Sequence, residues 1–462
     1  MDWGPIPDKP PGAGRLLQAQ VFVRHGARAQ IHDASCWPGG DEGAFTCDLW
    51  SLSTIVNSSD APLAPFFRAV HLHGRDGLPG NCAPGQLVES GYEMGRRNGR
   101  RLRDAYIARE DLLTGALRDL PADALRVRST DFSRTKQSAM ALISGMYNES
   151  QARGAPGIAM RIVDQAVETM IVNPNVCPAA AGWQNAFFQS LPNAQAAELQ
   201  AVCARLDITG STNEECMNAL GHSIDCLMSR LCPTVPFSPH NRTVPQEFLN
   251  DDASLLRRLW KVRDEVYWAY FKSAVDAGAF GALAGEVLAL AEGAVSRDAE
   301  APKLAVWSGH DTGPMEPLYA AFDLRPEPPF WPAFGSMLIL EVWESTNGSL
   351  ARWISDGAVV QGPMPFSEFQ LQARALVRTA DLCHDEPARP DHAKAEGYSF
   401  AEGLVKATDS RHWGRTQAAL ARTALVCCAI GALVLARWFG VVKAGSAPSF
   451  VDPHARFLRF GL

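Results

Sequence analysis

The sequence predicts an α/β protein in which strands and helices alternate around one open sheet and a mainly helical segment interrupts the order. Three apolar stretches predict buried strands, at residues 16–23, 124–128 and 303–307, and each is followed at once by charged or polar residues. Helical spacing dominates residues 171–300, where Pro and Cys are scattered. Open α/β sheets bind ligands at the carboxyl ends of their strands, so we expect the three strand ends to form one site.

The first strand ends in two arginines, Arg24 and Arg28, on either side of His25 and Gly26. Positive charge at the end of a buried strand is unfavourable unless an anion sits beside it. The planar guanidinium suits phosphate oxygens, and glycine lets backbone N–H groups approach them. A neutral imidazole can attack phosphorus, so His25 is a candidate nucleophile. Taken alone, the segment is equally consistent with an ordinary basic turn.

The second strand, residues 124–128, leads into the Ser-Thr-Asp sequence at 129–131, which supplies good N-cap residues for an amphipathic helix that reaches about Tyr147. Arg128 is therefore predicted at the carboxyl end of a strand, beside a helix N-terminus. Backbone N–H groups and the helix dipole favour anions at such a place. Arg128 is a second candidate for binding phosphate.

The third strand, residues 303–307, is followed by His310 and Asp311. A further strand is predicted at residues 334–343, and a helix at residues 364–380 closes the core.

Other helices are predicted at residues 86–106, 194–206 and 251–292. The arginines of the first of these helices are expected to form a solvated face. Four cysteines lie close enough together to form disulfides within the helical segment, although the sequence leaves their pairing open: Cys203, Cys216, Cys226 and Cys232.

Composition excludes one class of partner. The 462 residues are 47% hydrophobic and 20% charged, as in a globular protein with a sizeable core. The net charge of −7 gives no basic field of the kind that nucleic-acid binding needs, so any anion site must be local.

His71 and His73 are two residues apart but lack a third nearby ligand, so we expect surface histidines and no metal site.

Nine of the eleven cysteines precede the C-terminal apolar run, and none forms a CxxC pair. This spread favours structural disulfides in an oxidising compartment over zinc binding. Four Asn-x-Ser/Thr sequons also favour a secretory route, at Asn57, Asn148, Asn241 and Asn347. Residues 1–14 do not indicate a secretory route, because they are rich in Pro and Gly and lack the apolar region of a signal peptide.

The C-terminal region predicts a membrane anchor. Residues 423–436 form an uncharged apolar run of 14 residues, and arginines near both ends can extend it by snorkelling. We expect a transmembrane helix at residues 416–442, with an amphipathic or buried helix as the alternative.

Together, the three strand ends supply the groups that a phosphomonoesterase needs. Phosphoryl transfer depends mostly on positioning and charge neutralisation, which arginines and a second histidine provide. Asp311 can protonate the leaving alkoxide if burial raises its pKa or if the medium is acidic.

These motifs resemble the histidine acid phosphatase family, the larger branch of the histidine phosphatase superfamily. The match consists of RHGAR at 24–28, RSTDFSRTKQSA at 128–139 and HDT at 310–312, in the family's order. QLVESG at 86–91 and NVCP at 175–178 support it. The resemblance covers roughly residues 18–385.

The resemblance implies that His25 forms a phosphohistidine, that Asp311 donates the proton, and that the phosphate is held by Arg24, Arg28, Arg128 and His310. It also implies a doubly wound, mostly parallel sheet flanked by helices, an inserted helical cap, and no metal or organic cofactor. A disulfide between Cys177 and Cys383 is implied as well.

Two positions depart from the family pattern. Gln30 stands where a proline is usual, and Ser336 or a neighbour stands where many members have a cysteine.

We therefore expect a membrane-anchored acid phosphatase that acts on small phosphomonoesters and binds no nucleic acid. Phytase-like, lysophospholipid and glycan phosphatases remain alternatives, as do a phosphate-transferring mutase of the other superfamily branch and a binding protein on an inactive phosphatase fold. A homodimer is left open. The expected parts are a core at 1–170 and 301–384, a cap at 171–300, a linker at 385–415, a transmembrane helix at 416–442 and a cytosolic tail at 443–462.

The topology is predicted in two conflicting ways. Without a signal peptide, a single C-terminal anchor would leave the catalytic part in the cytosol. The cysteines and sequons instead favour a lumenal or extracellular catalytic part, in the endosome, in the lysosome or at the cell surface. We expect the second arrangement, with Met1 not the true start of the protein.

Overall fold

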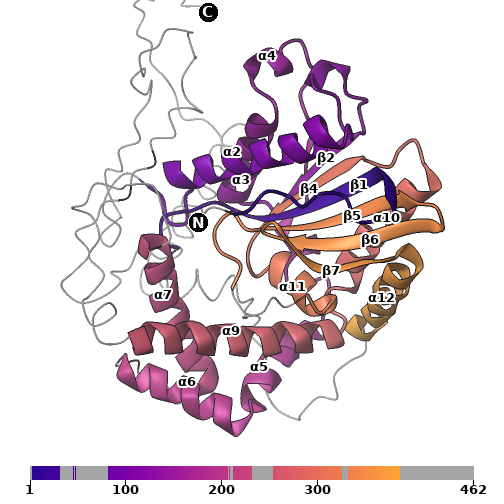
Figure 1. Ribbon diagram of the computed structural model, residues 1–462. Coiled ribbons are helices and arrows are strands. Elements are labelled where there is room, and N and C mark those ends of the chain that lie inside the picture. The colour runs from indigo at the N-terminus through magenta and orange to yellow at the C-terminus, as the bar shows by residue number, and fades with distance from the viewer. Residues whose placement is uncertain are drawn as a thin grey trace, which may run out of the picture. The chain divides into compact units, whose positions relative to one another are not determined.

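The computed structural model describes residues 3–31, 45, 47, 82–206, 208, 212–231, 253–324 and 331–384. These residues form one mixed sheet of seven strands, with helices packed on both of its faces (Figure 1). The predicted α/β class is confirmed.

The sheet is half parallel and half antiparallel. Its strands, in spatial order, are β3 (Met160–Ile162), β2 (Leu125–Ser129), β4 (Leu304–Gly309), β1 (Ala13–Arg24), β5 (Met337–Ser345), β6 (Gly348–Ser355) and β7 (Ala358–Pro365). The first four are parallel, and β5, β6 and β7 each run antiparallel to the strand before them. The prediction of a mostly parallel sheet is therefore wrong, because two-residue turns join β5 to β6 and β6 to β7, whereas a parallel pair needs a long crossover.

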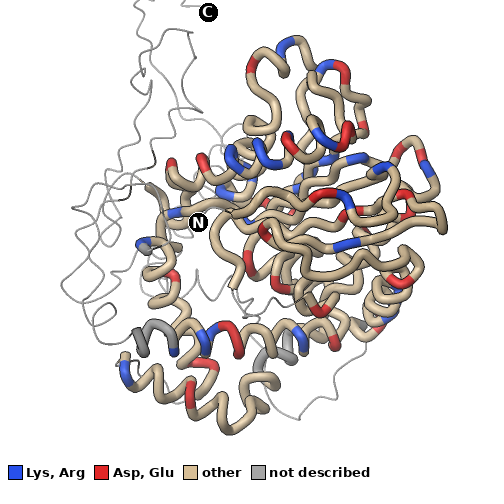
Figure 2. The backbone as a smooth tube through the Cα atoms, viewed as in Figure 1, with Lys and Arg blue, Asp and Glu red and all other residues tan. Residues whose placement is uncertain are grey.

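The helices match most of the predicted segments. They are α2 (Glu89–Arg103), α3 (Ser133–Met146), α4 (Glu149–Ala152), α5 (Ala180–Gln189), α6 (Asn193–Arg205), α7 (Asn213–Leu231), α9 (Ala253–Asp276), α10 (Gly281–Ser296), α11 (Met315–Ala321) and α12 (Phe366–Thr379). The predicted helix at 251–292 is in fact two helices, separated at Gly278, whose φ of 85° glycine adopts readily. Figure 2 shows arginines along α2, whose last turn carries three of them, where they complement the helix dipole.

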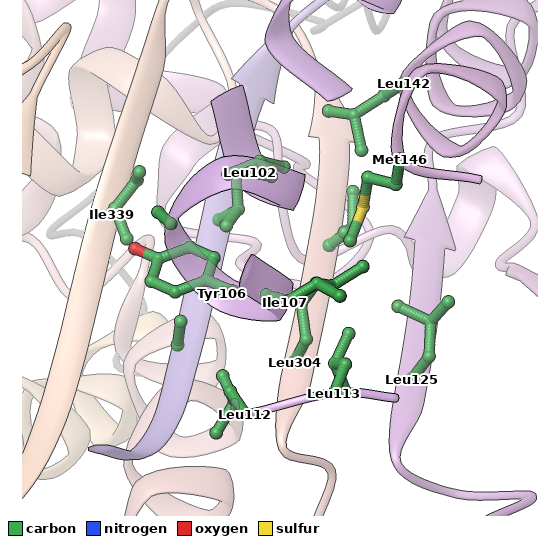
Figure 3. Packing of buried hydrophobic residues seen from close by; sticks show 14 of the residues in the cluster. Leu102, Tyr106, Ile107, Leu112, Leu113, Leu125, Leu142, Met146, Leu304 and Ile339 are labelled. Atoms are coloured by element: carbon green, nitrogen blue, oxygen red, sulfur yellow. The ribbon is translucent and has the colours of Figure 1, made fainter. Parts of the chain in front are cut away.

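One face of the sheet packs beneath α2 and α3. Val21 and Val23 of β1 point to this face, and side chains from β2, β4 and both helices meet them there. Figure 3 shows this cluster, which includes Leu102, Tyr106, Leu125, Leu142, Met146, Leu304 and Ile339. Each fully buried Leu or Met side chain stabilises the fold by about 1.5–3 kcal/mol.

The other face of β1 packs against α10. Gln18 donates to the carbonyl oxygens of Leu290 (2.9 Å) and Pro302 (2.8 Å), and Gln20 donates to that of Val287 (2.9 Å). These bonds satisfy two buried amides within an otherwise apolar strand. The alternation of β1 therefore places successive side chains on opposite buried faces, and α10, although it lies within residues 171–300, packs on the sheet.

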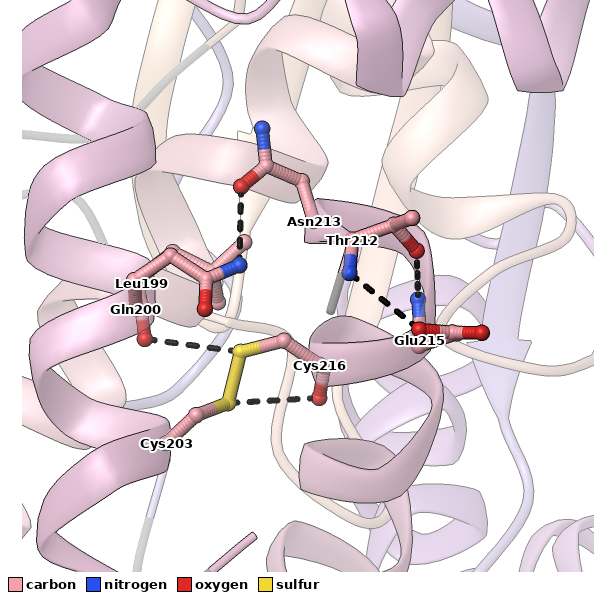
Figure 4. The surroundings of a disulfide bond; sticks show 7 residues. All are labelled: Leu199, Gln200, Cys203, Thr212, Asn213, Glu215 and Cys216. Atoms are coloured by element: carbon pink, nitrogen blue, oxygen red, sulfur yellow. Dashed lines mark hydrogen bonds between the residues drawn. A yellow bond between two sulfur atoms is a disulfide. The ribbon is translucent and has the colours of Figure 1, made fainter. Parts of the chain in front are cut away.

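Helices α5, α6, α7 and α9 form a separate group that lies below the sheet in Figure 1. A disulfide between Cys203 and Cys216 joins α6 to α7 (Figure 4). Cys203 and Cys216 were two of the four cysteines expected to form disulfides within this segment.

Two further disulfides tie distant parts of the chain together. Cys177 pairs with Cys383, as the family resemblance implied, so that prediction is confirmed. Cys47 pairs with Cys82.

The predicted linker, transmembrane helix and tail at residues 385–462 lie outside the described residues. Within the described part, no single helix is both long and apolar enough to cross a membrane. The consecutive segments Arg258–Asp276 and Gly281–Ser296 meet that combined criterion only as a pair, and a bend of 77° separates them.

Candidate active site

Two neighbouring parallel strands bring the two histidines together. β1 and β4 pair with Arg24 opposite Gly309, so His25 and His310 follow adjacent strand ends. The backbone N–H of His25 donates to the carbonyl oxygen of Gly309 (2.9 Å), and the imidazole centroids are 5.4 Å apart in an edge-to-face arrangement. The sequence prediction that these strand ends form one site is correct for this pair.

The His25 ring has a defined orientation. Its Nδ1 lies 2.9 Å from the carbonyl oxygen of Gly26, which can only accept a hydrogen bond, so Nδ1 carries the proton and Nε2 keeps its lone pair. Gly26 itself packs against the backbone of Gly91 at the start of α2, where any side chain would overlap. Burial, followed by the positive charge of Arg134, lowers the pKa of His25 well below its ordinary value. The imidazole therefore stays neutral in mild acid.

Arg24 and Arg28 lie over the ring of Phe334, with guanidinium carbons 4.2 Å and 5.5 Å from its centroid. Nη1 of Arg24 donates to the carbonyl oxygen of Pro332 (2.5 Å), and Nη2 pairs with Oδ2 of Asp311 (2.8 Å). Segment 332–336 thus positions the two arginines next to His25.

Arg28 pairs with a carboxylate from the helical group. Its Nη1 lies 2.7 Å from Oδ1 of Asp225 on α7, and the other oxygen of Asp225 accepts from the backbone N–H of Ile31 (2.7 Å). Both side chains of the ion pair are buried. The helical group therefore contributes a charged residue to the edge of the site.

Arg134, in the first turn of α3, also belongs to this group. One of its guanidinium nitrogens lies 3.4 Å from Nδ1 of His310, and its guanidinium carbon lies 4.6 Å from the centroid of the Phe132 ring. Burial, and then the like charge of Arg28, lower the pKa of Arg134 to about 9. A cation under that much repulsion is one that an incoming anion would stabilise.

His310 is held by hydrogen bonds at both ring nitrogens. Because Arg134 can only donate to Nδ1, Nε2 carries the proton and donates to Oγ1 of Thr130 (3.1 Å). Thr130 in turn donates to Oγ1 of Thr135 (3.1 Å) at the start of α3. Burial, and then Arg134, lower the pKa of His310 well below its ordinary value, so this ring is also neutral.

Asp311 is ionised in this structure. Its Oδ2 accepts from Nη2 of Arg24 and from Nε1 of Trp331 (2.7 Å), and its Oδ1 accepts from the backbone N–H of Thr312 (3.0 Å). Burial would raise the pKa of Asp311, but the charge of Arg24 and the Trp331 hydrogen bond outweigh it and hold that pKa below its ordinary value. Of the two conditions that the sequence analysis set for Asp311 as proton donor, a burial-raised pKa or an acidic medium, the first is not met in this structure.

The structure does not bring Arg128 to this group. Its guanidinium is held between Glu168 and Glu286 and lies over the ring of Trp307, with its carbon 5.4 Å from the ring centroid. Strand alternation is the reason: Val127 faces α3, so Arg128 faces α10 together with its β4 partner Trp307. The prediction that Arg128 binds phosphate is corrected on this point.

Three guanidinium groups and two neutral imidazoles thus gather at the strand ends, balanced by the carboxylates of Asp225 and Asp311. Among the residues that the structure describes, no three His, Cys, Asp or Glu side chains come together as a metal site. His71 and His73 lie outside the described residues. The charge and the donor geometry fit a tetrahedral oxyanion such as phosphate.

Comparison with known proteins decides the family. The histidine phosphatase superfamily (branch 2) matches residues 15–355. The chain belongs to this branch.

Relatives of known name include counting factor 60 of Dictyostelium discoideum, which is 26% identical over 354 residues, or 71% of this chain and 76% of that protein. The 2-phosphoxylose phosphatase 1 of Danio rerio is 26% identical over 360 residues, or 72% of this chain and 68% of that protein.

Solved structures of the same fold include the Klebsiella sp ASR1 phytase, with a TM-score of 0.50 and 15% identity over 82% of this chain and all of that one. The D. castellii phytase has a TM-score of 0.50 and 15% identity, and the match covers 88% of each chain.

Within this branch-2 histidine phosphatase, the motif at 128–139 holds two arginines six residues apart, and the structure brings Arg134 rather than Arg128 to His310. Arg128 lies at the end of a strand, whereas Arg134 lies in the first turn of the helix that follows. The signal that separates them is the alternation of β2, because Leu125 and Val127 mark the face beneath α3 and so assign Arg128 to the opposite face.

Of the two departures from the family pattern, Ser336 has a clear structural role. Its hydroxyl donates to Oδ2 of Asp356 (2.9 Å), and its carbonyl oxygen accepts from the backbone N–H of Arg24 (3.0 Å). Gln30 is buried, and its carbonyl oxygen accepts from the backbone N–H of Gly85 (2.7 Å).

Proposed function

We propose that this protein is an acid phosphatase that hydrolyses phosphomonoesters through a phosphohistidine at His25. The observation that carries the proposal is the orientation of the His25 ring. Its Nδ1 proton is bound by the Gly26 carbonyl, so the lone pair of Nε2 is available among three guanidinium groups. Because its pKa is lowered, this nucleophile stays neutral in the acidic range.

The reaction proceeds in two steps. Nε2 of His25 attacks phosphorus, the bond from phosphorus to the ester oxygen breaks, and that oxygen takes a proton from Asp311. Water then attacks the phosphohistidine, returns a proton to Asp311, and inorganic phosphate leaves. Arg24, Arg28 and Arg134 hold the phosphoryl oxygens throughout, and His310 contributes to this binding when its Nε2–H turns from Thr130 to the phosphate.

Asp311 becomes an acid only when substrate binds. In the ligand-free protein Arg24 holds its carboxylate ionised. A bound phosphate competes for the same guanidinium and adds negative charge beside the carboxylate, and both effects raise the pKa of Asp311. Substrate binding thus favours the protonated form of Asp311, which can then act as the general acid.

The test is the replacement of the nucleophile. We expect His25→Ala to lower kcat for an aryl phosphate by about 10³-fold or more, and acid-quenched wild-type protein to carry acid-labile phosphate that the variant lacks. His222→Ala, on α7, serves as a matched histidine control. A His25→Ala variant that kept more than about a tenth of wild-type turnover would contradict the proposal.

For the substrate, we propose a phosphorylated saccharide. The similarity to the Danio rerio 2-phosphoxylose phosphatase 1 supports this class, and the likeness to phytases shows the fold alone. A panel of phosphorylated sugars, inositol phosphates, lysophosphatidate and aryl phosphates, assayed from pH 4 to 8, measures the preference. A kcat/KM for inositol hexakisphosphate or lysophosphatidate above that of every sugar phosphate would overturn the choice.

We propose that the catalytic part lies in an oxidising compartment and that residues 416–442 anchor it in a membrane. The disulfides support the compartment, since such bonds persist outside the cytosol. Two sequon asparagines, Asn148 and Asn347, are exposed.

Glycosidase treatment of the protein from its own cells should increase its gel mobility, and the paired substitutions Asn148→Gln and Asn347→Gln should remove part of that change. A mobility that does not change, together with a catalytic part that protease digests from the cytosolic side of intact membranes, would leave a cytosolic enzyme.

A further inference from the structure

Arg128, which does not belong to the group around His25, is buried and forms a cluster with polar side chains on the other face of the sheet. Its Nη2 lies 2.7 Å from Oε1 of Glu168 and 2.9 Å from Oγ1 of Thr169, and its Nη1 pairs with Oε2 of Glu286 on α10. Thr169 closes the cluster by donating to the other oxygen of Glu286 (2.6 Å). One guanidinium therefore joins strand β2, helix α10 and the segment at 168–169.

The segment that Arg128 holds is itself ordered by local hydrogen bonds. Oε1 of Glu168 also accepts from the backbone N–H of Met170 (2.9 Å). Asn173 donates to the carbonyl oxygens of Gln165 (2.9 Å) and Glu168 (3.2 Å), which closes the loop on itself. The backbone at 168–171 is thus fixed relative to the sheet through Arg128.

The same segment packs against the turn that carries two catalytic groups. A side chain at Gly313 would overlap the carbonyl of Met170 and the backbone of Ile171, so the two backbones are in contact. Gly313 belongs to the tight turn after β4, in which its carbonyl oxygen accepts from the backbone N–H of His310 (2.5 Å). Asp311 lies within this turn, and Glu316 donates its backbone N–H to the Asp311 carbonyl (2.9 Å).

We infer that Arg128 is a positioning residue. It fixes segment 168–171, which packs against the turn that carries His310 and Asp311. It thereby determines the positions of the proton donor, Asp311, and of one phosphate ligand, His310. This inference rests on the proposed phosphatase function. It assigns Arg128 a role distinct from phosphate binding, because both of its terminal nitrogens, Nη1 and Nη2, are already directed to Glu168, Thr169 and Glu286.

Kinetics separate this role from that of a phosphate ligand. For an alkyl phosphate, whose leaving group needs the proton, we expect Arg128→Gln to lower kcat about tenfold or more per active site, with KM and the Ki of inorganic phosphate changed less than about threefold. For aryl phosphates, the fall in kcat should be smaller in Arg128→Gln, as it should be in Asp311→Asn. Arg128→Lys, which keeps the charge but cannot bridge both carboxylates, should lie between wild type and Arg128→Gln.

The matched control is Arg161→Gln on β3. Arg161 is the strand partner of Arg128, and it pairs with Asp123 at the surface. Arg161→Gln should leave kcat and KM for the alkyl phosphate, the Ki of inorganic phosphate and kcat for aryl phosphates unchanged. An Arg128→Gln variant with a tenfold higher phosphate Ki and an unchanged kcat would identify a phosphate ligand and overturn the inference, as would unchanged kinetics in both Arg128 variants.

Hydrogen exchange tests the contact without reference to activity. We expect amides in peptides covering 168–171 and 310–314 to exchange faster in Arg128→Lys and in Glu286→Gln than in wild type, and not in Arg161→Gln. Glu286 is partly exposed, so its variant serves if Arg128→Gln does not fold. Unchanged exchange rates in Arg128→Lys and in Glu286→Gln would overturn the positioning role, whatever the activity of the wild-type protein. A wild-type protein without phosphohistidine would instead contradict the proposed function alone.

Discussion

At the scale of single residues, the sequence predicted which strand-end residues meet better than it predicted the groups around them. His25, His310 and Asp311 follow strand ends directly, so their meeting follows from parallel strand order alone. Arg134 lies one helical turn beyond a strand end, and only the start of α3 determines where its side chain points. The charge state of Asp311 could not be foreseen either, because it depends on Arg24 and Trp331, from opposite parts of the chain.

Arg134 should control both phosphate affinity and the pKa of the nucleophile. We expect Arg134→Gln to raise the Ki of inorganic phosphate about 10-fold or more, since a charge-assisted hydrogen bond contributes about 1.5–3 kcal/mol. Its positive charge disfavours the imidazolium of His25, so its loss raises that pKa and moves the acid limb of kcat/KM to higher pH.

The conservative variant separates these two effects. Arg134→Lys keeps the charge but loses the planar fork, so the affinity should fall while the acid limb stays in place. Profiles of kcat/KM against pH for the two variants, with one substrate, provide the measurement. An acid limb that moves equally in both would show that charge is not the cause.

At the scale of elements, the predicted helices were found more completely than the strands. Helical periodicity is visible over three or four turns, which is why α2, α3, α6 and α12 matched their segments. β3 has only three residues, and β6 and β7 lie in a meander whose polar, Gly-containing pattern gave no clear strand signal. The boundary between α9 and α10 was missed because both helices are apolar enough to continue one pattern.

The turn between β6 and β7 holds a carboxyl group that links the meander to the site. Asp356 accepts hydrogen bonds from the backbone N–H of Met337 (2.8 Å) and the hydroxyl of Ser336, and burial raises its pKa to about 6. Because this pKa exceeds the unfolded value of about 3.9, the folded state binds the proton more tightly, and stability falls as pH rises from about 4 to above 6.

Replacement of this group by an amide should remove that pH dependence. Between pH 4 and pH 7, wild type should lose on the order of 2–3 kcal/mol of unfolding free energy that Asp356→Asn keeps. Urea unfolding of both proteins at the two pH values measures the difference. Parallel losses in both proteins would mean that Asp356 does not titrate in this range.

At the scale of the whole described part, the disulfides close loops of very different length. Cys177 and Cys383 are separated by 206 residues, and Cys203 and Cys216 by 13. The first pairing was implied by family resemblance, and the sequence alone left the others open, because spacing does not determine connectivity.

Loop length predicts which bridge matters more. The chain-entropy model gives a stabilisation of about 5 kcal/mol for the long loop and about 3 kcal/mol for the short one. We therefore expect the double variant Cys177→Ala/Cys383→Ala to lose more unfolding free energy than Cys203→Ala/Cys216→Ala when both are unfolded in urea. The reverse order would show that native-state strain or residual structure outweighs loop entropy.

The ion pairs of Arg24 with Asp311 and of Arg28 with Asp225 also have a consequence for turnover. Each of these cations already has an internal counterion, so a phosphate that binds here competes with a carboxylate for each guanidinium. The net binding energy of an anion is then the difference between its own interaction with the guanidinium and the guanidinium–carboxylate interaction that it replaces. Because the two are similar, the affinity for sulfate, chloride and the released phosphate is lowered alike. When product leaves, the carboxylates return to their arginines. In the proposed reaction, this competition disfavours the binding of other common anions, and the same two carboxylates assist the departure of phosphate.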